Sequence, residues 1–446
     1  MTMLTADEGS LLRLMEDVLP AVRVWEQGEE KKRPQIFSLP VVVALMLRQR
    51  LDERGTQQAV VRQLAAGQLD RLLPDGKRVR ERTISPASGG YAQACQRLPV
   101  GTMEKVCDQV LEELGQRIEP EPELELPVLV LDGTGLSLEH RGPLLDKYPC
   151  SRNQYGQGHW GMLKLVGLHD VRTGIALRPA WGPMYGEKAV SEQALAQEAV
   201  ARAPAGSVIL GDGNFGIFSF VYAVQQSDRG MVFRLTRRRA QAMGAARLLP
   251  QGEIDFCWKP SRGDRSANPG LPSDAEIHGR LIVVSLKGWR EPIYLFTTLR
   301  QSAEKIVSLY CLRWNIEVDF RTLKDTLRLH HLRGKGPAAV EKELLIAIVA
   351  YGLVRTCMAL AARRRGLAPR RLSFTQCSGW LNDMLEKLYS PLPALRQQAF
   401  DRLLTFMAGA KLPQRQKQRA YPREVWGHRQ SFPNRHPAKA AEQKTK

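Results

Sequence analysis

The chain has 446 residues, of which 65 are Lys or Arg and 46 are Asp or Glu, so its formal net charge is +19. Hydrophobic residues make up 43% and charged residues 25%, a balance typical of a folded globular protein that excludes a mainly disordered chain. The basic excess predicts an acidic partner, and the length gives room for several domains of about 100–200 residues each.

The sequence predicts a cytoplasmic protein without a membrane span. Its longest apolar runs, 39–47 and 344–354, are shorter than the roughly 18–20 residues that cross a bilayer. The N-terminus lacks the basic and apolar segments of a secretory signal. The seven cysteines are scattered without a CxxC pair, which predicts reduced thiols and argues against a zinc module or a disulfide framework.

The first 118 residues are predicted to be helical. Apolar residues recur at three- and four-residue spacing over 11–25, 39–51, 56–66 and 103–116. Arginine is interleaved through 48–82, which favours a small DNA-binding domain, with a solvated helical bundle as the alternative. The acidic, proline-containing stretch 119–127 is a predicted linker.

A mixed sheet covered by helices is predicted next. The expected strands are 128–132, 159–169, 175–181, 207–213 and 231–236, and the expected helices are 191–203 and 217–226. Strand-like pieces without a strong helix follow over 237–300, which predicts a β-rich insertion. Long helices are expected over 303–329 and 344–362, before a polar tail that begins at residue 411.

Acidic and basic residues are grouped in a way that suggests a site. Asp132 and Asp212 each follow an apolar run that we expect to end there, although an Asp at such a position also begins ordinary turns. On the helix 303–329, apolar residues form one stripe. Four residues form a second stripe beside it: Tyr310, Arg313, Glu317 and Lys324.

The spacing Tyr310-x2-Arg313-x3-Glu317-x6-Lys324 resembles the YREK signature of bacterial insertion-sequence transposases. Asp132 in LVLDGT and Asp212 in LGDGNFG resemble the first two acidic residues of that family's DDE triad. The resemblance covers about residues 120–380. It implies a ribonuclease-H-like catalytic core (119–236 and 301–375) with a β-rich insertion (237–300). With the helical DNA-binding domain (1–118) and a C-terminal helical region with a basic tail (376–446), the prediction is a multidomain α/β protein.

The resemblance also implies a reaction, which is metal-dependent cleavage of DNA at element ends followed by strand transfer into target DNA. In-line displacement at phosphorus suits two Mg²⁺ ions, with Mn²⁺ as a substitute, held by carboxylates. Asp132 would bridge both ions, and Asp212 and Glu317 would each complete one. The charges of Arg313 and Lys324 suit DNA phosphates, and Tyr310 can donate to another phosphate oxygen.

The expected partner is double-stranded DNA, bound by a homodimer that acts on no small-molecule substrate. Trp289 is a weaker DNA-binding candidate that would stack on a flipped base, although a tryptophan in a β-rich segment is more often part of the core. Glu192 is interpreted as a helix-dipole partner near the start of its helix. Two alternatives to the transposase are a DNA-binding protein derived from one without catalytic activity and a nuclease of the same fold.

Overall fold

The computed structural model describes residues 5–16, 35–117, 125–154, 156–285 and 291–413. Met1–Lys411 form one compact unit and Leu412–Lys446 a second. The boundaries expected at 118, 236, 300 and 375 all fall inside the first unit, so they stay predictions. Trp289 and most of the basic tail lie outside the described residues.

The N-terminal segment is helical where the structure describes it. Its helices are α1 (Ala6–Glu16), α3 (Leu39–Leu51), α4 (Gln57–Ala65), α5 (Lys77–Arg80), α6 (Gly89–Arg97) and α7 (Val100–Gly115), with a short 3₁₀ turn η1 (Asp70–Leu72). The hydroxyl of Thr56 caps α4 by accepting the N–H of Ala59 at 3.1 Å. The first predicted helix, 11–25, is placed too late, because α1 already begins at Ala6. Its second half falls on residues 17–34, which are outside the described part.

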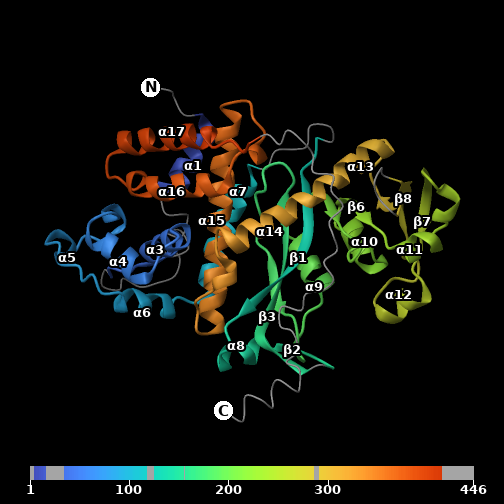
Figure 1. Cartoon of the computed structure of the whole chain (residues 1–446), viewed down its shortest axis with the longest axis horizontal. Coiled ribbons are helices and arrows are strands. Elements are labelled where there is room, and N and C mark those ends of the chain that lie inside the picture. The colour runs from blue at the N-terminus through green and yellow to red at the C-terminus, as the bar shows by residue number, and fades with distance from the viewer. Residues whose placement is uncertain (1–4, 17–34, 118–124, 155, 286–290, 414–446) are drawn as a thin grey trace, which may run out of the picture. The chain divides into compact units, whose positions relative to one another are not determined.

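One mixed sheet of nine strands forms the centre of the described chain (Figure 1). The strands are β1 (Val128–Leu138), β2 (Cys150–Asn153), β3 (Gly156–Asp170), β4 (Ala180–Pro183), β5 (Val208–Gly211), β6 (Gly230–Arg234), β7 (Gly252–Trp258), β8 (Ile277–Val284) and β9 (Ile293–Thr297). Their order is β2-β3-β1-β5-β6-β9-β8-β7, with β4 beside β3. Strand β1 is antiparallel to β3 and parallel to β5, which is parallel to β6.

The sheet is buried on both faces. Successive side chains of a strand point to opposite faces, and alternate residues of β1 belong to two different hydrophobic clusters. Val128 and Val130 belong to one hydrophobic cluster, which also contains residues of the helices after residue 303. Leu129 and Leu131 belong to the other cluster, together with α9 (Glu192–Val200) and α10 (Phe218–Gln226). The prediction of a mixed α/β structure with helices around a sheet is confirmed.

Two predicted strands differ from the observed ones. Strand β1 continues past Asp132 to Leu138, because the following residues pair with β3. The expected strand 175–181 is wrong in its first half, where Ala176 makes only an isolated bridge to His169 and β4 begins at Ala180.

The segment 237–300 continues the central sheet. Strand β9 pairs with β6, and β8 and β7 follow at that edge. Beside these strands it contains the short helices α11 (Arg237–Ala242) and α12 (Arg262–Ala267) and the 3₁₀ turn η2 (Ala245–Leu248), none of them a strong helix. A reciprocal capping box between Ser261 and Asp264 begins α12. A six-residue helix carries too little periodicity to be read from the sequence.

The single long helix expected over 303–329 is broken in the structure. It consists of α13 (Ala303–Cys311), the 3₁₀ turn η3 (Leu312–Trp314) and α14 (Asn315–Asp325). Arg328 then adopts a left-handed backbone, φ 55°, before the turn η4 (Leu329–His331). Apolar periodicity runs through all these pieces, so it could not reveal the breaks.

The remaining helices surround one buried helix. The 27-residue α15 (Pro337–Arg363) contacts α3 and α7 as well as α16 (Phe374–Leu388) and α17 (Pro393–Gly409). The helix α8 (Gly142–Lys147) and the turn η5 (Pro369–Arg371) complete the described elements. Among the described helices, α15 alone is long and apolar enough to cross a membrane, but nearly all of its apolar window is buried inside the protein.

Candidate active site

The sheet places the two predicted aspartates beside each other. In the parallel pair β1–β5, Val130 lies opposite Leu210, and Asp132 and Asp212 each follow two residues later. Asp212 comes directly after the last residue of β5, whereas Asp132 lies inside β1 opposite Gly167 of β3. The expectation that Asp132 ends its strand is therefore wrong, but adjacency of the two side chains needs only the register.

Each aspartate makes a local backbone hydrogen bond that fixes its carboxylate. Oδ1 of Asp132 accepts the N–H of Gly133 at 2.8 Å, and Oδ1 of Asp212 accepts the N–H of Asn214 at 2.9 Å. Burial and the charges of Asp212 and Glu192 raise the pKa of Asp132 to about 6, although the Gly133 hydrogen bond and Arg313 oppose that shift. Carboxylates held together against their own repulsion are typical of a site for a positive charge.

Arg313 connects the predicted third carboxylate to the first. Its Nη1 lies 3.3 Å from Oδ2 of Asp132, and its Nη2 lies 3.9 Å from Oε1 of Glu317. The arginine is buried while Glu317 is half-exposed. Arg313 lies in the turn η3, and Glu317 follows four residues later in the first turn of α14. Arg313 thus contacts the acidic residues themselves, and its expected contact with DNA phosphate stays a prediction.

Tyr310 of α13 belongs to this group, and Lys324 lies farther along α14, the helix that carries Glu317. The Arg313 guanidinium lies over the Tyr310 ring, 6.0 Å from its centroid. Burial raises the pKa of Tyr310, although the charges of Arg313 and Arg234 lower it and that of Asp212 raises it. Lys324 is half-buried in the last turn of α14, where burial lowers its pKa. The structure therefore brings Tyr310, Arg313, Asp132, Asp212 and Glu317 together, while Trp289 lies outside the described residues.

Glu192 is a carboxylate at this site that the sequence analysis did not assign to it. It is the first residue of α9, after the N-cap Ser191, so the helix-dipole interpretation fits its position. Its side chain also reaches β1, because a Cβ atom added to Gly133 would lie only 1.9 Å from its Oε1. Burial and the charge of Asp212 raise its pKa, whereas Lys164 lowers it. The feature of the sequence that relates to this contact is Gly133, directly after Asp132, because any larger residue there would collide with the Glu192 carboxylate.

A buried network of charged side chains joins α14 to α15, η5 and β3. Asp319, fully buried and two residues after Glu317, accepts hydrogen bonds from Arg355 of α15 at 2.6 Å and from Arg370 of η5 at 2.9 and 3.0 Å. Nδ1 of His169 on β3 lies 3.5 Å from its Oδ2. This network fixes α14 against the sheet, α15 and η5, and therefore fixes the backbone that carries Glu317.

A second set of hydrogen bonds joins the end of α14 to α3. The Arg50 guanidinium donates to the carbonyl of Leu327 at 3.1 Å and pairs with Glu343 at 3.2 Å. In return, the Arg328 guanidinium donates to the carbonyls of Gln49 and Arg50 at 2.9 and 3.0 Å. Each arginine thus caps carbonyls on the other's segment, which couples the N-terminal helices to the helix of Glu317.

Oxygen ligands of this kind suit a hard divalent cation. Asp132, Asp212, Glu317 and Glu192 offer carboxylate oxygens, and a bound cation would oppose the burial and the carboxylate repulsion that together raise the pKa of Asp132. Arg313 and Tyr310 bring donors to the same place. Carboxylate oxygens of this kind are ligands for metal ions, and the guanidinium and phenol are donors that suit a phosphate group.

Comparison with known proteins agrees with this geometry. The model of the family described as "Transposase DDE domain" matches residues 123–353, which is more than half of the chain. The chain is also 24% identical over 408 residues to "Transposase InsG for insertion sequence element IS4" of Escherichia coli (strain K12), covering 90% of this chain and 88% of that protein. The matched range contains both aspartates, the YREK residues and the sheet between them. The family predicted from the sequence is confirmed, and the chain belongs to the DDE-domain transposases.

Proposed function

We propose that this transposase cleaves DNA at the ends of its element and joins the freed ends to target DNA, with Asp132, Asp212 and Glu317 holding two Mg²⁺ ions. As a member of its family the chain binds DNA, and DDE transposases generally use divalent metal ions. The observation that carries the finer proposal is the pair of Arg313 contacts, to Asp132 and toward Glu317, beside the register of β1 and β5.

The roles follow from the positions of the side chains. Asp132, which is less exposed than Glu317, would be the ligand shared by both ions, while Asp212 and Glu317 would each hold one. Such ions, when bound, stabilise charge on the attacking and leaving oxygens. Glu192 would support the ligand set from the opposite side of Gly133. Arg313 would orient Asp132 and Glu317, and Tyr310 and Lys324 would contact phosphates of the DNA strand.

The strand arrangement supports a ribonuclease-H-like core for this chemistry. Strands β3 and β1 are antiparallel, β5 and β6 are parallel to β1, and α9 and α10 lie beside them. We infer that β7, β8 and β9 extend this core at its far edge. A homodimer that holds two element ends together is the assembly we propose on DNA.

Cleavage of duplexes that carry the element's terminal sequence tests the proposal. Asp132→Asn, Asp212→Asn and Glu317→Gln should each abolish Mg²⁺- or Mn²⁺-dependent cleavage while gel-shift binding of the same duplex persists. Asp325→Asn is the matched control, because that acid is exposed on the same helix. Cleavage that persists in the Asp212 variant would remove this residue from the site.

Product analysis separates the alternatives. A nuclease of the same fold would cut the duplex without joining a 3′ end to a second DNA molecule, and a non-catalytic derivative would only bind. Joined products that depend on all three carboxylates are the expected result.

A further inference from the structure

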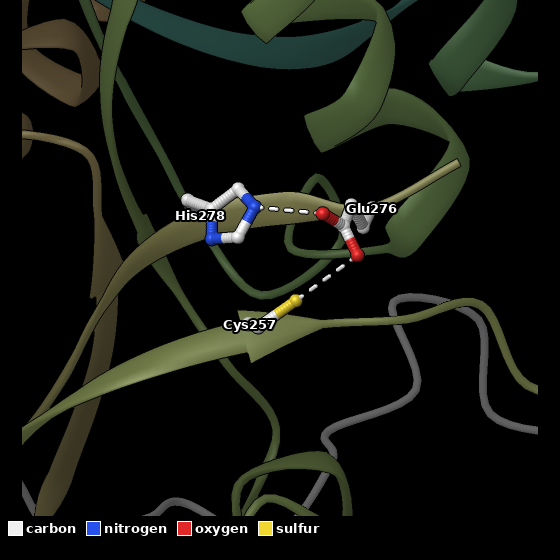
Figure 2. Close-up of side chains that lie close together, drawn as sticks. All are labelled: Cys257, Glu276 and His278. Atoms are coloured by element: carbon white, nitrogen blue, oxygen red, sulfur yellow. Dashed lines mark hydrogen bonds and ion pairs between the residues drawn. The ribbon is translucent and has the colours of Figure 1, made fainter. Parts of the chain in front are cut away.

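Three different metal-binding side chains lie together on the outer face of the β7–β8 ribbon, away from the acidic site. Cys257 of β7 is the register partner of His278 on β8, so both side chains point to the same face. Glu276 lies two residues before His278 and therefore shares that face. Figure 2 shows the thiol and the imidazole directed toward the two oxygens of one carboxylate.

The distances are close to those of a coordination sphere. Sγ of Cys257 lies 3.5 Å from Oε2 of Glu276, and Nε2 of His278 lies 2.9 Å from Oε1. All three ligand atoms fall within 4.8 Å of one another. Around a tetrahedral zinc ion, neighbouring ligand atoms are about 3.3–3.6 Å apart, given Zn–S of about 2.3 Å and Zn–N or Zn–O of about 2.0–2.1 Å. Small side-chain rotations would therefore suffice.

We propose that Cys257, Glu276 and His278 bind one Zn²⁺ ion, with water as the fourth ligand. A thiolate and an imidazole together select zinc over Mg²⁺, which prefers oxygen alone. Binding replaces the thiol proton, which passes to solvent, and leaves the imidazole neutral with its proton on Nδ1. The scattered cysteine spacing concealed this site, because its ligands come from two strands and Cys257 and Glu276 are 19 residues apart.

Binding here would join an edge strand to the sheet. Among the described strands, β7 pairs only with β8 and is the last in the sheet order. Lys259, whose Nζ lies 3.7 Å from Oε2 of Glu276, competes with the ion for the carboxylate, and its exposed side chain can swing away. The bound ion would hold the pairing register of β7 with β8. This site differs from the proposed catalytic site, whose carboxylates include no sulfur ligand.

Cobalt titration of the full-length protein tests the proposal, because Co²⁺ substitutes for Zn²⁺ and reports thiolate ligation by charge-transfer absorption. One Co²⁺ per chain should produce this absorption, and Zn²⁺ should abolish it. Cys257→Ser should remove it, whereas Cys311→Ser, the matched control at the other exposed cysteine, should retain it. The carboxylate site cannot mimic the signal.

Variants of the other ligands make the test specific. His278→Ala and Glu276→Gln should each weaken Zn²⁺ binding by more than about 100-fold, since losing even an outer hydrogen-bond partner costs about 10- to 100-fold. Lys259→Met should strengthen it. All of these side chains are exposed, so thermal unfolding should stay near that of the parent protein. Absence of thiolate absorption, or absorption indifferent to the His278 and Glu276 changes, would overturn the proposal.

Discussion

Replacing Asp319 with Asn should remove a large share of the protein's stability. The substitution keeps the side-chain shape but leaves Arg355 and Arg370 without their shared negative charge, and Arg355 is buried. Removing one partner of a buried ion pair costs about 3–5 kcal/mol. Two arginines depend on Asp319, so we expect the upper part of that range, against a total stability of about 5–15 kcal/mol for a folded protein.

The sign of the pH dependence follows from the pKa of Asp319. Burial raises this pKa, but Arg355, the nearby His169, and Arg370 outweigh burial and hold it well below its usual range. A carboxyl with a lowered folded-state pKa stabilises the protein above its unfolded pKa of about 3.9. That contribution is lost as the pH falls from about 4 toward the folded-state pKa. The difference between parent and variant should therefore shrink below about pH 4.

Urea denaturation followed by circular dichroism at pH 7 and at pH 3 measures both effects. Asp325→Asn on the same helix is the control, because its carboxylate is exposed, and it should change stability by no more than about 0.5 kcal/mol. A loss below about 1 kcal/mol for Asp319→Asn at pH 7 would show that the network does not support α14, and a loss unchanged at pH 3 would show that charge is not its cause.

The other expectations concern the acidic site and its link to α3. Glu192→Gln should weaken Mn²⁺ binding in calorimetry by about 10- to 100-fold, whereas Glu198→Gln, exposed on the same helix, should have no effect. Gly133→Ala should reproduce the Glu192→Gln result, because its Cβ would displace the Glu192 carboxylate. Gly135→Ala, whose added Cβ would lie 3.4 Å from its nearest neighbour, should bind Mn²⁺ normally. Equal effects of the two alanines would exclude the contact between Glu192 and Gly133. Arg50→Met should cost about 3 kcal/mol in urea denaturation, because it leaves a buried carbonyl without its donor and Glu343 without its arginine partner. A change under about 0.5 kcal/mol would mean that the link carries no stability.

The parts of the site that follow from local patterns were predictable. Two apolar runs followed by Asp-Gly, and a helix with Tyr310, Arg313 and Glu317 at fixed spacing, were enough to identify the family, which the family model confirms. The family match does not test the roles of the individual residues. Their assembly depends on the β1–β5 register and on η3, neither of which periodicity reveals.

The contacts that the sequence did not reveal are all long-range. Asp319 lies on the apolar face of its helix, three residues after Ile316 and four before Leu323, but its partners Arg355 and Arg370 are 36 and 51 residues away. Glu192 reaches β1 only because α9 and β1 pack together at Gly133. The continuation of the sheet through β9 also depends on pairing with β6, which no local composition specifies.

The central position of α15 bears on how the chain folds as it is synthesised. Helices α3 and α7 leave the ribosome first, but the helix against which they pack is complete only at Arg363, and 363 − 115 = 248 residues separate that point from the end of α7. At about 5–20 residues per second, the face of α7 that packs on α15 stays uncovered for roughly 12 to 50 s, and that of α3 for longer. During that interval the nascent N-terminal segment is a substrate for chaperones, and the transposase acquires its final N-terminal fold only after most of its catalytic segment exists.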